Sequence, residues 1–161
     1  MNEPIWITEA RKHIGTTEIK GPENNPEILQ WGKDTKRGGI NQDSVPWCSA
    51  FVGACLEKVG IQSSRFESAR SYLQWGEPLP EAVYGCVVIF SRTDGGHVGF
   101  VVGKDEQGRL MVLGGNQGDA VSIAPFNIMR VMAYRWPNGE PLEMEALPIL
   151  SSSTASSTNE A

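Results

Sequence analysis

The sequence predicts an α+β fold, in which helices come first and an antiparallel sheet follows. Apolar residues recur at helical spacing before Pro80, whereas short β-branched or aromatic runs divided by turn residues follow it. Helices followed by a series of hairpin-connected strands are typical of the α+β class. At 161 residues, the chain has the length of one domain with a sizeable core.

Two helices are expected from apolar stripes. Residues 4–14 carry the first, and Gly15 ends it. Residues 47–59 carry the second and clearest stripe, with apolar side chains at i, i+3, i+4, i+7, i+8 and i+11 from the cysteine, and Gly60 follows in the position that favours a helix end.

A third helix is expected at residues 68–75, with Ser68 as its N-cap. Residues 20–46 are rich in Gly, Pro, Asn and Asp, so they are expected to be irregular apart from a short helical turn at 25–31. A loop of this length in a compact domain often serves a functional site.

The strands are expected after Pro80 as an antiparallel meander. A hairpin loop is expected at residues 104–108. From Pro137 the periodicity ends, so a domain at 1–137 and a largely disordered, Ser/Thr-rich extension at 138–161 are predicted. The apolar runs lie at 84–90, 97–103, 109–115, 120–126 and 131–136.

Composition excludes several classes of protein. The formal net charge is -5 and no run of Lys or Arg offers a basic patch, which argues against a nucleic-acid partner. No apolar run approaches the roughly 18 residues of a membrane span. The first residues lack the charged and apolar regions of a secretory signal, so we expect synthesis in the cytoplasm without Sec export.

The three cysteines fit neither a disulfide framework nor a zinc site. Cys48, Cys55 and Cys86 are odd in number, and no CxxC pair is present. At least one free thiol is therefore expected.

Cys48 is the candidate nucleophile. It follows Pro46 and Trp47 at the expected start of a helix, where free N–H groups and the positive end of the helix dipole favour a thiolate and are expected to lower the thiol pKa. A cysteine on an apolar stripe is equally well explained as buried packing, and that explanation suits Cys55.

A nucleophilic thiol needs a base, and the chain has two histidines. His13 lies between charged neighbours on the first helix and is expected at the surface. His97 opens a strand between Gly96 and Gly99, where the missing side chains permit close backbone approach and leave the ring open. A histidine that merely caps a strand end fits the same position.

Asn116 follows the end of the next strand, so a hairpin connection brings it beside His97. Its amide oxygen is placed to accept the imidazole N–H and to fix the tautomer. Gly-Asn-Gln-Gly is also ordinary turn sequence. The ordered set of thiol, imidazole and carboxamide is a stronger signal than any of its members.

Three stretches in this order resemble the papain-type cysteine peptidases of bacterial cell walls, the NlpC and CHAP groups. They are PWCSAFV at 46–52, GHVGFVVG at 96–103 and GGNQGDAV at 114–121, and YRWP at 134–137 is similar to the usual end of the domain. Many relatives carry Gly-Asp where this chain has Gly-Cys at 85–86, a position expected to be structural.

The resemblance implies a papain-like fold with Cys48 as nucleophile, His97 as base and Asn116 as third member. It implies hydrolysis of an amide bond in the stem peptide or cross-link of peptidoglycan, with no metal and no cofactor. Two other functions stay open: a non-catalytic cell-wall binding module, and a transferase or deamidase that acts on a small amide.

Further residues are candidates for substrate binding. Asp43 is placed to bind an amine of the substrate or to order its loop, although an ordinary surface carboxylate fits this position slightly better. Trp47 is placed to wall the groove or to anchor the core. Gln117 and Asp119 are candidates to line the site, and a side chain of residues 41–44 to assist an oxyanion hole.

Delivery is expected by a route other than Sec export, because the substrate lies in the periplasm. A phage lysin released through a holin fits, and so does a toxin injected by a type VI secretion apparatus, which is slightly favoured. A toxin would travel with an immunity protein as partner.

Overall fold

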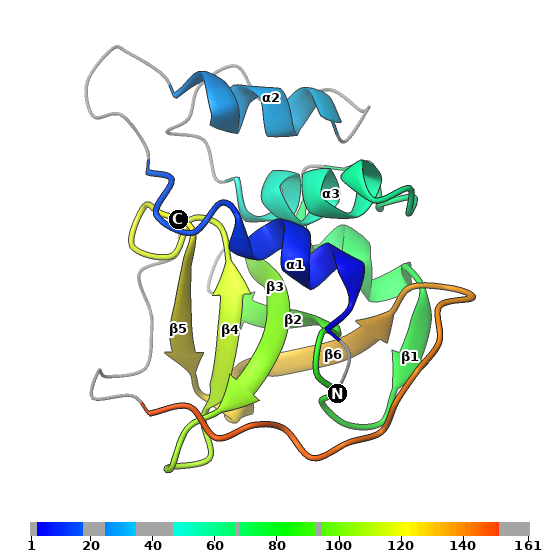
Figure 1. Cartoon of the computed structure of the whole chain (residues 1–161), viewed down its shortest axis with the longest axis vertical. Helices are drawn as coiled ribbons and strands as arrows, with labels where there is room; N and C mark the ends of the chain where they lie inside the picture. Colours follow the sequence, from blue (N-terminus) through cyan, green and yellow to red (C-terminus); the bar gives the residue numbers. More distant parts are fainter. Residues whose placement is uncertain (1–2, 18–24, 35–46, 67, 93–94, 152–161) are drawn as a thin grey trace.

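The computed structural model describes residues 3–17, 25–34, 47–66, 68–92 and 95–151 (Figure 1). In these residues, three α-helices lie together on one side of an antiparallel six-stranded sheet, which confirms the α+β class. The helices are α1 (Ile5–Arg11), α2 (Pro26–Asp34) and α3 (Cys48–Lys58). The strands are β1 (Glu77–Leu79), β2 (Val87–Arg92), β3 (Gly95–Lys104), β4 (Leu110–Gly114), β5 (Ser122–Phe126) and β6 (Val131–Trp136).

The sheet is a meander with one return. Strands β2 to β5 pair in chain order, but β6 crosses back to pair with β2 on its other side, and β1 pairs with β6. The sheet order is therefore β1-β6-β2-β3-β4-β5, whereas a simple meander would leave β6 beside β5. β1 was not predicted, because its three residues carry no alternating pattern.

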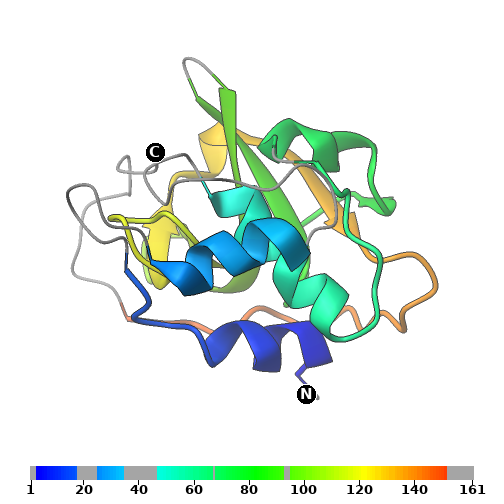
Figure 2. The same ribbon diagram turned by 90° about the horizontal axis from the view of Figure 1, so that it is seen from above.

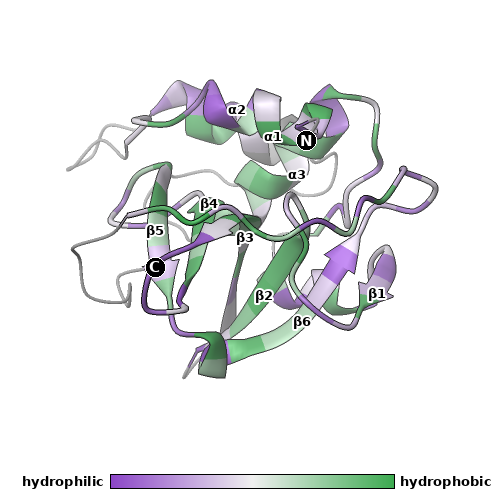
Figure 3. Cartoon of the chain, turned by 60° about the horizontal axis from the view of Figure 1, so that its bottom comes forward, coloured by the Kyte–Doolittle hydropathy of each residue, from purple (hydrophilic) through white to green (hydrophobic). Residues whose placement is uncertain are grey.

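α3 is the central helix of the helical layer. Its predicted range of 47–59 agrees with the observed Cys48–Lys58 within one residue at each end. Buried side chains run all round it rather than along one stripe, from Cys48 to Leu56, because the sheet packs on one side while α1 and α2 cover the others (Figure 2). The core thus continues from the sheet through α3, and Figure 3 shows apolar residues along β2 and α3.

The other helical segments differ from expectation in length or type. α2 extends past the single turn expected there, and it packs on α3. The third predicted helix is a 3₁₀ helix, η1 (Ala69–Gln74), and the predicted cap is confirmed, since the Ser68 hydroxyl accepts the N–H of Arg70. A second 3₁₀ turn, η2 (Ile128–Arg130), precedes β6.

The chain after Pro137 has no helix or full strand in its described part, up to residue 151, but it stays against the sheet. Ile149 forms a parallel bridge with Lys104, and the Leu150 N–H donates to the Lys104 carbonyl at 2.8 Å. The predicted disorder of the extension can therefore concern only the residues after 151, which lie outside the described ones. Among the described residues, no helix combines the length and apolar character needed to cross a membrane.

Candidate active site

Three separate segments meet at the start of α3. The backbone of Val98, directly after His97 on β3, hydrogen-bonds the Cys48 sulfur. Gly115, just after β4, packs on the same helix start, where an added Cβ would lie 2.7 Å from the Trp47 ring and 2.8 Å from Phe51 Cβ. The segments of the predicted nucleophile, base and carboxamide therefore converge, as the hairpin argument predicts.

The electrostatic surroundings of Cys48 work in opposite directions. Burial raises the pKa of its thiol above the ordinary value, and this effect prevails. The N–H groups of Val98 and Ser49, the charge of Arg92 and the N–H of Cys48 itself lower that pKa in part. The Trp47 side chain accepts no hydrogen bond from the first turn of α3, and backbone groups of that turn hydrogen-bond the sulfur instead.

The expectation of a lowered thiol pKa is therefore wrong. The helix start supplies the predicted donors, but the expectation left out the desolvation of a sulfur whose residue exposes 4% of its surface. The raised pKa favours the neutral thiol at neutral pH.

His97 lies fully buried on β3, opposite Phe90 of β2, so the expectation of an open ring is wrong. Its ring stacks on Phe126 of β5 at a centroid distance of 5.2 Å and an interplanar angle of 8°. Phe90 adds a looser stack at 6.4 Å. Gly99 allows the close approach that was predicted, because a Cβ there would lie 2.6 Å from the side chain of Val112 on β4.

The carboxamide found beside the imidazole belongs to Gln117. Its Oε1 lies 3.0 Å from His97 Nε2. Asn116, the predicted third member, is fully buried one residue earlier in a left-handed conformation with φ of 61°. The role assigned to Asn116 stays a prediction. The GGNQ motif held the signal for Gln117, but two adjacent carboxamides cannot be told apart from sequence.

The other predicted site residues have varied outcomes. Trp47 is fully buried, and its ring lies 5.7 Å from that of Trp31 of α2 at an angle of 39°, so its side chain anchors the core and does not wall an open groove. Asp119 lies half-buried with φ of 60°, in the turn before β5. Asp43, Pro46 and the other residues of 41–44 lie outside the described residues.

His13 is not the surface residue that was expected. Its Nε2 lies 2.9 Å from Glu9 and its Nδ1 2.8 Å from Glu27, and its ring contacts Trp31 edge-on at 5.3 Å. The side chain therefore joins α1 to α2. Burial raises the pKa of Glu9, but the hydrogen bonds and charges of His13 and Lys12 outweigh it, so the pKa is lowered overall.

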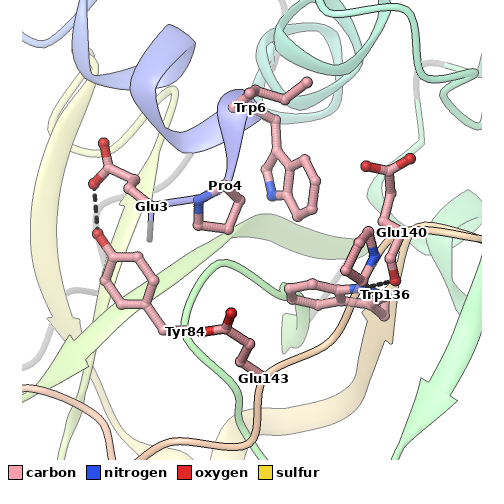
Figure 4. A pocket seen from close by; sticks show the side chains of 9 residues that line it. Glu3, Pro4, Trp6, Tyr84, Trp136, Glu140 and Glu143 are labelled. Carbon is pink, nitrogen blue, oxygen red and sulfur yellow. Dashed lines mark hydrogen bonds between the residues drawn. The ribbon is translucent and has the colours of Figure 1, made fainter. Parts of the chain in front are cut away.

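A hollow of about 290 Å³ lies elsewhere, between the N-terminal segment and the chain that follows β6 (Figure 4). Tyr84 donates to the Glu3 carboxylate at 2.6 Å, and Trp136 Nε1 donates to the Glu140 carbonyl at 3.0 Å. Its described lining includes neither Cys48 nor His97. The described residues also hold no group of three or more His, Cys, Asp and Glu side chains arranged for a metal ion.

Comparison with known proteins supports the same family. The family model described as CHAP domain matches residues 40–116, a range that includes both Cys48 and His97 and ends at Asn116. No curated protein matches the chain. The match confirms the resemblance to the NlpC and CHAP groups, and the helices packed on an antiparallel sheet agree with a papain-like fold.

Proposed function

We propose, from the premise that residues 40–116 belong to the CHAP domain family, that this chain hydrolyses an amide bond of peptidoglycan with Cys48 as nucleophile and His97 as base. CHAP domains are generally hydrolases that act on peptidoglycan, which supports the substrate class. The third member is one of two adjacent carboxamides, either Asn116, as predicted from the sequence, or Gln117, whose Oε1 lies 3.0 Å from His97 Nε2.

One observation carries the assignment of the site. The sulfur of Cys48 accepts a hydrogen bond from the backbone of Val98, the residue next to His97, so nucleophile and base belong to adjoining positions. A nucleophile and a base within reach of each other are the minimum that acyl transfer needs.

The first half of the reaction forms a thioester. His97 takes the thiol proton as Cys48 Sγ bonds to the carbonyl carbon, and the carbonyl electron pair moves to oxygen. The imidazolium then protonates the amide nitrogen, the C–N bond breaks and the amine leaves. Because burial keeps the thiol neutral, proton transfer and attack are coupled.

Water completes the cycle. His97 removes a proton from water, whose oxygen attacks the thioester carbon. The C–S bond breaks, a carboxylic acid is released and the sulfur recovers its proton. The N–H groups of Cys48 and Ser49 at the start of α3 are suited to stabilise the oxyanion once the sulfur has become bonded to carbon.

The decisive experiment compares purified sacculi treated with wild type, Cys48→Ala and Cys55→Ala. Wild type and Cys55→Ala should release muropeptides, whereas Cys48→Ala should release none above background. Cys55 is the matched control because it is a buried thiol on the same helix, where burial and the charge of Glu9 both raise the thiol pKa.

Equal release by wild type and Cys48→Ala would refute the enzymatic function and favour a binding module. Mass spectrometry of the released products separates hydrolysis from transfer, because only hydrolysis leaves a free carboxylate and a free amine. The same products identify the bond among three candidates: glycan to L-Ala, D-Glu to diaminopimelate, and the cross-link.

We further propose delivery of the chain to the periplasm by a route other than Sec export, as an injected toxin rather than a lysin. Expression with an added export signal should lyse the producing cells, whereas expression without it should not. Co-expression of an immunity protein should suppress the lysis. Lysis by the cytoplasmic form alone would contradict a wall target.

A further inference from the structure

We infer that Gln117 is the residue that positions His97, and that it does so in a space which the missing side chain of Gly114 leaves open. The inference rests on the proposed function, because it assigns a role within the same site. It places the holding contact one residue beyond the position predicted from the sequence.

The carboxamide of Gln117 is held in one orientation. Its Nε2 donates to the Val112 carbonyl at 3.1 Å and to the Ser122 carbonyl at 2.9 Å. Carbonyl oxygens only accept, so the NH₂ group must point toward them and Oε1 must face His97. Gln117 exposes only 4% of its surface, so water does not compete appreciably for these contacts.

This orientation decides the tautomer of the imidazole. Oε1 is only an acceptor, so the His97 nitrogen 3.0 Å away must carry the proton. In a neutral ring the lone pair then lies on Nδ1. A general base must present that lone pair, so Nδ1 is the nitrogen that receives the thiol proton.

Stacking alone cannot supply this selection. Phe126 lies nearly parallel to the His97 ring and restrains its plane, but a half-turn of the ring within the stack exchanges each nitrogen with a carbon. The in-plane hydrogen bond to Gln117 distinguishes the two orientations. Loss of that bond would let a carbon replace Nδ1.

Gly114 is the second half of the arrangement. A Cβ at this position would lie 2.3 Å from Gln117 Oε1 and 3.5 Å from His97 Nε2. Any side chain there would displace the carboxamide from the ring. A turn residue reaches the histidine only because the strand residue beside it has no side chain.

The contacts also require an amide rather than an acid. In Gln117→Glu, a carboxylate oxygen would face the Val112 and Ser122 carbonyls without a proton to donate. The glutamine therefore holds the ring with a neutral partner. It fixes the base without adding the negative charge that would favour a permanent imidazolium.

The test reads the tautomer directly. The chain has two histidines, so ¹⁵N NMR of the rings resolves His97 in the full chain. Wild type should show the Nε2–H form. Gln117→Met keeps the length of the side chain but lacks the amide donor and the carbonyl acceptor, so it should show a mixture of both forms. Alkylation of Cys48 by iodoacetamide at pH 7 should slow at least about tenfold in this variant, since the base is misplaced.

Gly114→Ala should reproduce both effects, and Gly95→Ala is its matched control on the neighbouring strand, because a Cβ at Gly95 meets no atom within 4 Å. Gly95→Ala should leave tautomer and alkylation unchanged. In Asn116→Ala the Nε2–H form of His97 should persist. If Asn116→Ala lost that form while Gln117→Met kept it, the positioning role would belong to Asn116.

The inference would be overturned if the His97 ring of wild type carried its proton on Nδ1. It would also be overturned if Gln117→Met kept the tautomer and the alkylation rate of wild type. Either result would count even if another variant failed to fold. Neither measurement uses peptidoglycan. A wild type that holds the Nε2–H form but releases no muropeptide would refute the proposed function alone.

Discussion

The first and middle turns of α3 each bury a cysteine, but the two sulfurs have different surroundings. Around Cys48, N–H donors from α3 and β3 and the charge of Arg92 partly offset the rise in pKa that burial causes. Around Cys55, burial raises the pKa of the thiol and the negative charge of Glu9 raises it further. Among the described residues, no hydrogen-bond donor or positive charge is found that lowers it.

The difference shows that burial does not by itself separate a structural thiol from a reactive one. Cys48 exposes 4% and Cys55 2% of their surfaces, so exposure does not distinguish them. What differs is the set of polar groups around each sulfur. The N–H donors beside Cys48 are available because the helix begins there against a strand.

The largest expected effect is selective alkylation. Iodoacetamide at pH 8 should modify Cys48 at least about tenfold faster than Cys55, because donors that stabilise the thiolate surround only the former. Peptide mapping by mass spectrometry at several reaction times gives both rates in one sample. Equal protection of the two thiols would contradict the comparison.

A smaller effect is expected in alkaline stability. The folded pKa of Cys55 lies well above the ordinary value of 9.0, so its contribution is fully present below pH 9 and is lost as the pH rises through that folded pKa. At pH 10, about 1 kcal/mol of this contribution to the free energy of unfolding has been lost.

The unfolding free energy of Cys55→Ala should therefore fall less between pH 8 and 10 than that of wild type. Urea titrations at both pH values provide the measurement, and the change with pH removes any constant cost of the truncation. Identical pH dependence in the two proteins would argue that Cys55 ionises normally.

The smallest effect concerns Arg92. Its charge lowers the pKa of Cys48, so Arg92→Gln should slow alkylation of that thiol at pH 8 by about twofold, as expected for an interaction of about 0.5 kcal/mol. Lys58→Gln removes one charge from the opposite end of α3 and serves as the control. The effect of Arg92→Gln should shrink in 1 M salt, and a rate equal to that of the control would exclude it.

Local patterns were enough for much of the fold. The stripe from Cys48 onward located α3 within one residue, and Ser68 marked the start of η1. Short β-branched runs located β2 to β6. The return of β6 to β2 was not predictable in this way, because pairing between distant strands leaves no local pattern.

In the candidate site too, local patterns predicted some features, whereas others depended on contacts between distant segments. Cys48 and His97 were identifiable because each lies near the predicted start of an element, the first of a helix and the second of a strand flanked by glycines. The choice between Asn116 and Gln117 was not, because it depends on which carboxamide reaches the ring. The net pKa of the thiol was missed for a related reason, since desolvation depends on the whole surrounding shell.

By itself, the sequence determined the α+β order of elements, the helix that begins at a cysteine and the strand that begins near a histidine, because periodicity and turn chemistry act over a few residues. Only the tertiary structure decided that Gln117 contacts the imidazole, that Gly114 leaves it room and that the thiol rests neutral. Those properties depend on distances and burial between segments far apart in the chain, which no local pattern encodes.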